Sequence, residues 1–443
     1  MKNFAKRCCL LSLALMMCVP LGACYKTPST DLGSTTDSGE PPVSNAPSDT
    51  HTEAPVTLSS SEAFEGKAAA QALNSGTLLS VTDESLKKYV TTTVKDGYIF
   101  FNYDAPVFEI GGIPHPSQNN GNFNRLNTLD SAHFSAFPKN VVANSWNTSG
   151  ATVRFRTNAS YFVLKAAVHK FSTGSRHIAP RGVYGFDVYT GSGTQRVYCG
   201  EAGQLMVNAN GINEEIKLPG DWTEVIINLP LYGGVKSLEI GLPDDAQVAA
   251  PLERSTAPIL FYGSSITQGA CVNRPGNAYT NIVTRMLDAD CINLGFSSGA
   301  YGEQIVAEYV ATRGEGAAAI VLDYDRNSSA SQLRERHYDF YKTVRNKLPD
   351  VPIVLVSRTI YTESPSSEDI ERINTIKNTY NKAVEAGDEN IYFIDGSKMF
   401  SNYFESAPHL ADLITVDNRH PNEVGHFYMA MSVYDSLYEI LNK

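Results

Sequence analysis

From residue 257 to the C-terminus, short apolar runs alternate with longer segments of mixed polarity. The runs are rich in Val, Ile, Leu and Phe and predict strands, and the longer segments have room for helices. Strands are expected at 259–262, 291–296, 318–323, 353–356 and 392–394, and helices at about 278–287, 303–313, 330–348, 368–385 and 422–441. Five such β–α repeats predict a three-layer α/β/α domain, a parallel five-stranded sheet with helices on both faces.

Between residues 98 and 242 the pattern has a period of two instead. Val153–Thr157 and Thr223–Leu229 alternate apolar and polar side chains. Further strands are expected at 161–168, 182–189 and 235–240. Glycine-rich turns separate these runs and no helix of useful length fits between them, which favours an antiparallel β-sandwich. We expect this domain over residues 61–250 and the α/β domain over residues 255–443.

The first residues resemble neither domain. Basic residues up to Arg7 precede an apolar stretch that ends at Pro20 and is too short to span a bilayer comfortably. This arrangement is typical of a secretory signal peptide, which we place at residues 1–23.

The end of that segment, Leu21-Gly22-Ala23-Cys24, resembles the lipobox of bacterial lipoproteins. The resemblance implies that Cys24 is lipidated and that the protein is anchored on the extracytoplasmic side of the cell membrane; simple secretion is the alternative. Residues 24–60 are rich in Ser, Thr, Pro and Asp and poor in apolar residues. Such a segment buries too little surface to offset its ordering entropy, so we expect a disordered tether.

Composition narrows the classes of partner. The chain has 36 Lys plus Arg against 47 Asp plus Glu, a net charge of -11, which argues against nucleic acid or an anionic membrane surface as the main partner. Of seven cysteines, the three beyond position 24 are Cys199, Cys271 and Cys291. They are odd in number and lack the spacing of metal ligands, so we expect them to be small buried side chains.

The candidate nucleophile follows the first strand of the α/β domain, where the apolar run ends in Gly263-Ser264-Ser265. A buried strand followed by a turn of small residues exposes reactive groups at the carboxyl ends of parallel strands. Ser265 is therefore a candidate for covalent catalysis, with its own N–H free to face a substrate. By itself the stretch fits a phosphate-binding turn of a flavodoxin-like protein equally well.

A candidate base lies near the C-terminus. His420 follows Asp417 by three residues, close enough in a tight turn for the carboxylate to accept a hydrogen bond from the imidazole ring. The same pair could serve as two metal ligands, but no further His, Cys or carboxylate has zinc-like spacing nearby. We therefore expect neither a metal nor a cofactor.

Two further stretches are candidates for stabilising an oxyanion. Asn327 follows the strand that ends in Asp323-Tyr324-Asp325, and its amide is able to donate to a developing negative charge. The alternative is that Asn327 caps the next helix. Asn293–Gly302 is rich in Gly and Ser, and such residues leave backbone N–H groups accessible to a ligand.

Taken in their order along the chain, these stretches resemble the four sequence blocks of the SGNH/GDSL hydrolase superfamily, and particularly its bacterial carbohydrate-esterase-like members. Gly185–Tyr189 (Gly-Phe-Asp-Val-Tyr) resembles the Gly-x-Asp-Leu-Tyr motif of a β-sandwich that precedes some of these hydrolases. The resemblance implies that Ser265 is the nucleophile, His420 the base and Asp417 its orienting acid. It also implies an oxyanion hole made from the Ser265 N–H, a backbone N–H of the second block and the Asn327 side chain.

The chain departs from the family pattern at two positions. Ser264 stands where many members carry Asp, and ungapped alignment places Ser298 where the family usually has Gly, with Gly299 one residue later. The second-block donor is therefore Ser298 or Gly299. The α/β-hydrolase fold, the other common scaffold of serine esterases, is disfavoured because Thr267 stands where its Gly-x-Ser-x-Gly motif requires Gly.

We therefore expect a serine esterase that removes short acyl groups, most favourably acetyl esters of a polysaccharide. The alternative within enzymes is a lipid or small-ester acylhydrolase. The alternative from another class is a glycan-binding lipoprotein that keeps the hydrolase fold without activity.

Overall fold

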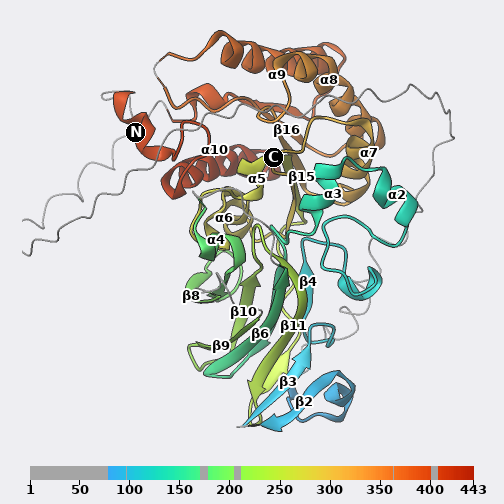
Figure 1. Cartoon of the computed structure of the whole chain (residues 1–443), viewed down its shortest axis with the longest axis vertical. Helices are drawn as coiled ribbons and strands as arrows, with labels where there is room; N and C mark the ends of the chain where they lie inside the picture. The colour runs from blue at the N-terminus through green and yellow to red at the C-terminus, as the bar shows by residue number, and fades with distance from the viewer. Residues whose placement is uncertain (1–77, 96, 170–177, 204–210, 363, 401–407) are drawn as a thin grey trace, which may run out of the picture. The chain divides into compact units, whose positions relative to one another are not determined.

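The computed structural model describes residues 78–443, with gaps at 96, 170–177, 204–210, 363 and 401–407 (Figure 1). All described residues belong to one compact unit, residues 58–443. The expected signal peptide, Cys24 and the tether lie outside the described residues.

The C-terminal part contains the expected parallel sheet. Its strands are β13 (Ile259–Gly263), β14 (Cys291–Gly295), β15 (Ala319–Asp323), β16 (Ile353–Val356) and β17 (Ile391–Ile394). They pair in the order β14-β13-β15-β16-β17, all parallel. The order reverses beside β13, because both β14 and β15 are its neighbours, and α/β sheets bind ligands outside the carboxyl ends of strands at such a point.

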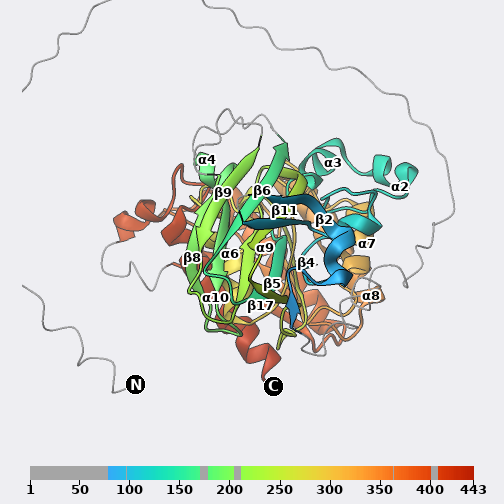
Figure 2. The same ribbon diagram turned by 90° about the horizontal axis from the view of Figure 1, so that it is seen from below.

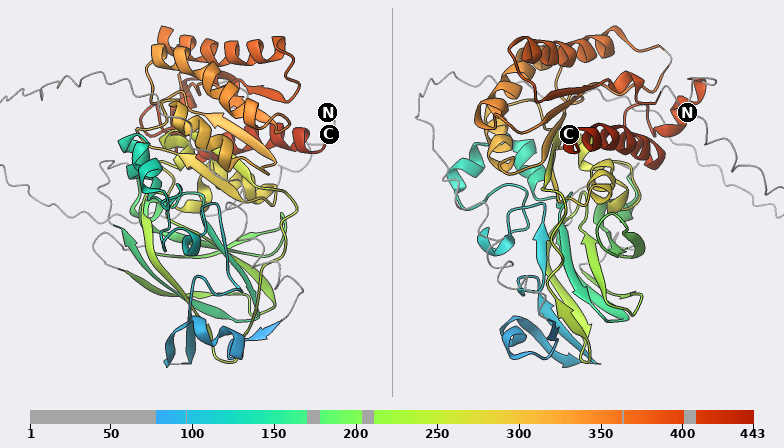
Figure 3. Two further views of the ribbon diagram at one scale, coloured as in Figure 1. Left: turned by 90° about the vertical axis from the view of Figure 1, so that its right-hand side faces the viewer. Right: turned by 180° about the vertical axis from the view of Figure 1, so that it is seen from behind.

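Helices cover both faces of this sheet, as expected. The expected helices are α6 (Tyr279–Met286), α7 (Gln304–Arg313), α8 (Ala330–Lys347), α9 (Ser367–Glu385) and α10 (Glu423–Leu441), and the structure adds the short helix α5 (Ser265–Gln268). Side chains of β13 alternate between two cores: Leu260 and Tyr262 pack with α7, α8 and α9, whereas Ile259 and Phe261 pack with α6 and α10. Figure 3 shows the orange helices and the red C-terminal helix on opposite sides of the sheet. The three-layer prediction is confirmed.

Two antiparallel sheets form the N-terminal part (Figure 2). Their strands are β1 (Leu79–Ser80), β2 (Val90–Lys95), β3 (Tyr98–Asn102), β4 (Glu109–Gly111), β5 (Thr152–Thr157), β6 (Tyr161–His169), β7 (Phe186–Thr190), β8 (Val197–Ala202), β9 (Ile212–Lys217), β10 (Thr223–Asn228), β11 (Gly234–Pro243) and β12 (Gln247–Ala249). One sheet has the order β1-β12-β5-β10-β7-β8 with β4 beside β5, and the other β2-β3-β11-β6-β9. Phe155 of the first sheet and Leu164 of the second share one apolar core, so the expected sandwich is confirmed.

The sequence prediction missed short helices in this part. They are α2 (Ser131–Ala136), α3 (Lys139–Ser145) and α4 (Pro180–Tyr184), and the strand expected at 182–189 begins only at Phe186. Phe137 and Val141, beside and within α3, belong to the core of the α/β domain rather than to that of the sandwich. Helices of one or two turns carry too little periodicity to be recognised, and their apolar residues have meaning only against a distant partner.

No helix in the described ranges combines the length and apolar composition that crossing a membrane requires.

Candidate active site

Ser265 is the first residue of α5, immediately after strand β13 of the parallel sheet. The Ser264 hydroxyl caps the helix by accepting a hydrogen bond from the Ile266 N–H at 3.2 Å. Gly263 is required by close packing, because a Cβ at this position would lie 1.9 Å from the Thr267 hydroxyl. Ser265 itself is only 8% exposed. The tight strand-to-helix turn thus fixes the serine at the carboxyl edge of the sheet.

The structure brings Ser265, His420 and Asp417 into one hydrogen-bonded row. The Oγ of Ser265 lies 2.9 Å from Nε2 of His420, and Nδ1 of His420 lies 2.8 Å from Oδ2 of Asp417. The other carboxylate oxygen of Asp417 accepts the His420 main-chain N–H at 2.7 Å. One carboxylate therefore fixes both the loop and the imidazole ring, as the spacing of three residues led us to expect. The geometry suits proton transfer from a serine hydroxyl to a histidine.

The surroundings keep Asp417 ionised. Burial raises the pKa of Asp417, but the hydrogen bonds from the His420 main chain and ring outweigh it and hold the pKa below its ordinary value. Asp395, a carboxylate at the end of β17, instead accepts hydrogen bonds from Ser397 and caps a short 3-10 helix.

The neighbouring His426 has a structural role. Its Nδ1 accepts the Tyr279 N–H at 3.2 Å, and its Nε2 lies 2.8 Å from the Ala270 carbonyl oxygen. Burial lowers the pKa of His426 to about 4, so the ring is neutral and links α6 to α10.

The second-block turn, residues 296–299, offers one backbone donor beside α5. The Gly299 N–H donates to the Phe296 carbonyl at 3.0 Å, and the Ser297 N–H donates to the Gln268 side chain at 2.9 Å. Among the described residues, none accepts a hydrogen bond from the Ser298 N–H. Of the two candidates from the sequence, Ser298 therefore has the available N–H and Gly299 does not.

Asn327 holds this turn. Its Nδ2 lies 3.1 Å from the Phe296 carbonyl oxygen and also hydrogen-bonds the Gly299 carbonyl. The alternative role, capping the next helix, is wrong, because Ser329 caps α8 in a reciprocal capping box with Gln332. Asn327 thus contacts the backbone on either side of Ser298.

Several contacts of the site come from the N-terminal part, where sequence reasoning assigned no role. The Tyr232 hydroxyl donates to the Ser265 carbonyl at 3.2 Å, and the Ser149 hydroxyl donates to the Gln268 carbonyl at 2.7 Å. Arg125 is fully buried and donates to the Gly295 carbonyl at 2.6 Å. Burial lowers the pKa of Arg125 to about 9. No local sequence signal marks these residues, because their partners are more than 30 positions away.

The Gly-x-Asp-Leu-Tyr-like motif also contacts the α/β domain. The buried carboxylate of Asp187 accepts hydrogen bonds from Asn228, from the Arg274 guanidinium and from the Gly276 N–H, each at 2.8 Å. Arg274 also donates to the Tyr189 hydroxyl at 2.6 Å. The motif therefore fixes the loop that follows α5.

Within the described ranges, no three His, Cys, Asp or Glu side chains are grouped as metal ligands. The three described cysteines carry free thiols; Cys291 is buried, and Cys199 and Cys271 are half-buried.

Comparison with known families agrees with this geometry. Residues 256–438 match the GDSL-like lipase/acylhydrolase family, and residues 98–248 match the GxDLY family, the N-terminus of SGNH-hydrolase-type esterases. A search of the curated proteins finds no match.

Among solved structures, a protein from Bacteroides ovatus designated a GDSL-like lipase is 26% identical, with a TM-score of 0.66 over 78% of this chain and 98% of that one. The salicylyl-acyltransferase SsfX3 of a tetracycline biosynthetic pathway is 18% identical, with a TM-score of 0.58 over 82% and 97% of the two chains. A family two carbohydrate esterase from Cellvibrio japonicus is 12% identical, with a TM-score of 0.49 over 78% and 98%.

The two family matches confirm the resemblance inferred from the sequence. Residues 256–438 form a domain of the GDSL-like lipase/acylhydrolase family, residues 98–248 form the N-terminal domain of SGNH-hydrolase-type esterases, and the protein is an ester-hydrolysing enzyme.

Proposed function

We propose that Ser265, His420 and Asp417 form a catalytic triad that hydrolyses short acyl esters, most favourably acetyl esters of a polysaccharide. The observation that carries the proposal is the row of two hydrogen bonds, Ser265 Oγ to His420 Nε2 at 2.9 Å and His420 Nδ1 to Asp417 Oδ2 at 2.8 Å.

In the first step, Ser265 Oγ attacks the ester carbonyl carbon while His420 Nε2 takes the hydroxyl proton. The tetrahedral intermediate collapses when the C–O bond to the alcohol breaks, and His420 returns its proton to the leaving oxygen. Water then attacks the acyl-Ser265 with His420 again as base, which releases the carboxylic acid and regenerates the serine. Asp417 remains ionised and stabilises the imidazolium.

Two backbone donors suit the oxyanion of the intermediate. The Ser265 N–H lies at the first turn of α5, where main-chain N–H groups have no acceptor within the helix. The Ser298 N–H is the available donor of the second-block turn. Asn327 would be a third donor only by giving up one of its two contacts with main-chain carbonyls.

The polar rim of the site favours a hydrated substrate. Ser298, Asn273, Asn418 and Arg419, in the loops that follow β14 and α5 and precede His420, are exposed. Hydroxyls and amides of this kind hydrogen-bond sugars, and they offer little affinity to a long hydrocarbon chain.

A second candidate, a lipid or longer-chain acylhydrolase, has its own supporting observation. Apolar side chains flank the catalytic loop and are well exposed: Leu413 at 62%, Val416 at 43%, Val424 at 50% and Phe427 at 49%. Their position on both sides of His420 suits contact with an apolar substrate or surface.

The location of the enzyme is a separate proposal. A lipid on Cys24, in the sequence Leu21-Gly22-Ala23-Cys24, would anchor the enzyme to the extracytoplasmic side of the cell membrane. Labelling cells with a radioactive or alkyne-bearing fatty acid tests it, because wild type should incorporate label and Cys24→Ala should not.

The test of activity is a substrate series with wild type, Ser265→Ala and the exposed-serine control Ser135→Ala. Acetylated polysaccharides and p-nitrophenyl esters from acetate to octanoate are compared by kcat/KM. We expect acetate to be favoured, Ser265→Ala to lose at least ~10³-fold in kcat, and Ser135→Ala to match wild type.

Two results would contradict the proposal. A kcat/KM that rises with chain length to octanoate would select the lipid acylhydrolase instead. Full activity in Ser265→Ala, or fluorophosphonate labelling of another serine, would remove Ser265 as nucleophile.

A further inference from the structure

The turn at residues 296–299 is held by side chains from two distant parts of the chain. Asn327 contacts the first and last carbonyls of the turn, those of Phe296 and Gly299. The two middle carbonyls accept hydrogen bonds from α3 of the N-terminal part. Asn144 Nδ2 lies 2.8 Å from the Ser297 carbonyl oxygen, and Asn140 Nδ2 lies 2.6 Å from that of Ser298.

The turn needs such support because its backbone is strained. Ser298 has φ 52° and Ala300 has φ 58°, the left-handed region that residues with a Cβ rarely adopt. Conformations of this kind persist only where the surrounding structure fixes them. Glycine adopts positive φ without steric cost, whereas Ser298 carries a Cβ.

Peptide geometry connects Asn144 to the candidate oxyanion donor. The Ser297 carbonyl and the Ser298 N–H belong to the same peptide unit, and no peptide bond of the described chain is cis. In a trans peptide the C=O and the N–H bonds lie in one rigid plane and point in opposite directions. A side chain that fixes the direction of the Ser297 carbonyl therefore also fixes the direction of the Ser298 N–H.

Asn144 is itself well anchored. Its main-chain carbonyl accepts a hydrogen bond from Arg125 at 2.7 Å, and its Oδ1 accepts one from Asn147 at 3.3 Å. Val141, one helical turn earlier, is fully buried, and its Cγ2 would lie 3.4 Å from a Cβ at Gly299. The helix is thus packed directly on the turn whose carbonyls it holds.

We propose that Asn144 is a positioning residue for the oxyanion hole, which orients the Ser297–Ser298 peptide so that the Ser298 N–H faces the tetrahedral intermediate. Asn140 supports the following peptide in the same way. The N-terminal domain is therefore part of the catalytic apparatus. The inference rests on the proposed esterase function.

The test compares wild type with Asn144→Ala and with the matched control Asn122→Ala, whose amide donates to Thr128 in the same N-terminal part and does not contact the turn. For Asn144→Ala we expect kcat to fall at least about tenfold with KM within about twofold. The fall should stay short of the about 10²–10³-fold cost of deleting an oxyanion donor. Inhibition by a trifluoromethyl ketone, which forms a tetrahedral adduct with the nucleophile, should weaken by the same factor, and Asn122→Ala should match wild type in both measurements.

A double variant separates positioning from loss of folding. Glycine at 298 removes the left-handed strain, so the fall in kcat caused by Asn144→Ala should be smaller in a Ser298→Gly background than in wild type. An equal fall in both backgrounds, or an unchanged inhibitor affinity together with a lowered melting temperature, would overturn the inference. Absence of ester hydrolysis in wild type, or full activity of Ser265→Ala, would instead overturn the proposed function.

Discussion

At the scale of single residues, the carboxylate that holds the helix of Ser265 is as informative as the proposed triad. Asp323, at the end of β15, is 7% exposed and accepts hydrogen bonds from the hydroxyls of Tyr279 at 2.9 Å and Thr267 at 3.0 Å. Burial and the negative charge of Asp325 raise the pKa of Asp323 to about 7, against the lowering effect of the two hydroxyls. The helix that begins at Ser265 is thus hydrogen-bonded, through Thr267, to a carboxyl group whose pKa is raised to about 7.

Because the pKa of Asp323 is raised in the folded state, we expect the stability of the protein to depend on pH. The folded pKa is about 7 and the unfolded value 3.8, so the native state binds more protons between these limits. The raised pKa therefore adds about 4 kcal/mol to the free energy of unfolding below the unfolded pKa of 3.8. This contribution is lost as the pH rises from 3.8 through 7. Asp323→Asn keeps an acceptor for both hydroxyls and cannot ionise.

We therefore expect the free energy of unfolding of wild type, relative to Asp323→Asn, to fall between pH 5 and pH 8. Urea denaturation at both pH values measures it. Parallel pH profiles for the two proteins would show that Asp323 does not titrate in this range.

At the scale of elements, the Gly-x-Asp-Leu-Tyr-like motif explains how the two domains share a loop. Asp187 on β7 has no exposed side-chain surface, and its partners Arg274 and Gly276 belong to the segment between α5 and α6. Asn273 and Asn277 of the same segment donate to Glu423 at the start of α10, just after His420. One carboxylate on the sandwich therefore holds the loop that is hydrogen-bonded to Glu423, three residues after His420.

Asp187→Asn should destabilise the protein, because it leaves the partly buried Arg274 guanidinium without its counter-charge and removes one of the acceptor oxygens. Breaking one side of a buried ion pair costs about 3 kcal/mol. Thermal unfolding should show a clearly lower Tm than Asp221→Asn, a control at an exposed loop position. Equal melting temperatures for the two variants would mean that the motif has no structural role.

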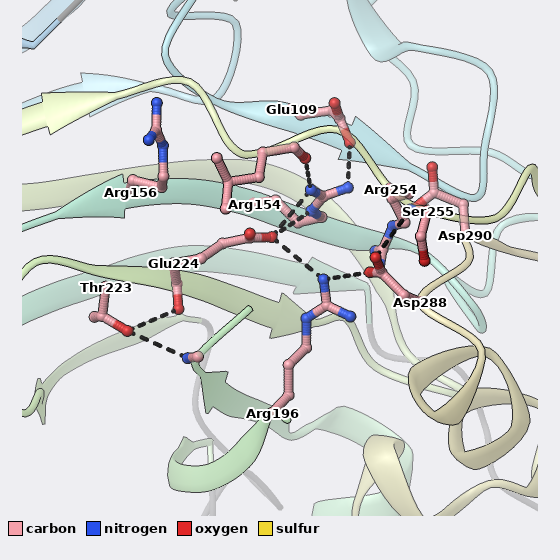
Figure 4. A network of polar contacts seen from close by, with 12 residues as sticks. Glu109, Arg154, Arg156, Arg196, Thr223, Glu224, Arg254, Ser255, Asp288 and Asp290 are labelled. Atoms are coloured by element: carbon pink, nitrogen blue, oxygen red, sulfur yellow. Dashed lines mark hydrogen bonds and ion pairs between the residues drawn. The ribbon is translucent and has the colours of Figure 1, made fainter. Parts of the chain in front are cut away.

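At the scale of the whole molecule, the two domains share buried charges as well as apolar contacts. Figure 4 shows Arg154 and Arg196 on either side of Glu224, with Arg196 also reaching Asp288. The Arg196–Asp288 distance is 2.6 Å, and Arg254 pairs with Asp290 at 2.7 Å. Arg154 and Arg196 belong to the sandwich region. Asp288 and Asp290 lie just before β14 in the α/β domain. Such groups are paired because an isolated buried charge is costly.

The α/β domain alone is therefore incomplete. Its core includes Leu126, Phe137 and Val141, and the carbonyls of Gly295 and Ser297 accept hydrogen bonds from Arg125 and Asn144 of the N-terminal part. We expect residues 255–443 expressed alone to lack a cooperative thermal transition and esterase activity, whereas residues 78–443 should keep both. An active, cooperatively folded 255–443 fragment would contradict this expectation.

The sequence alone determined the elements of the α/β domain and the identity of its candidate triad. The five strands and the five longer helices of this domain were predicted to within about two residues, because each is specified by a local apolar pattern; the one-turn helix α5 was not predicted. Ser265, Asp417 and His420 were found because each follows a recognisable local signal, and the structure places them in contact.

Only the tertiary structure decided the rest. The short helices, the choice of Ser298 over Gly299 and the partners of Asn327 all depend on where one peptide unit points relative to residues many positions away. A hydrogen bond is set by distance and direction in space, and residue type and spacing along the chain leave both undetermined until the domains have packed. The pattern of apolar residues therefore specifies the scaffold, and packing between the domains specifies which backbone N–H groups of the second-block turn are left without an acceptor among the described residues.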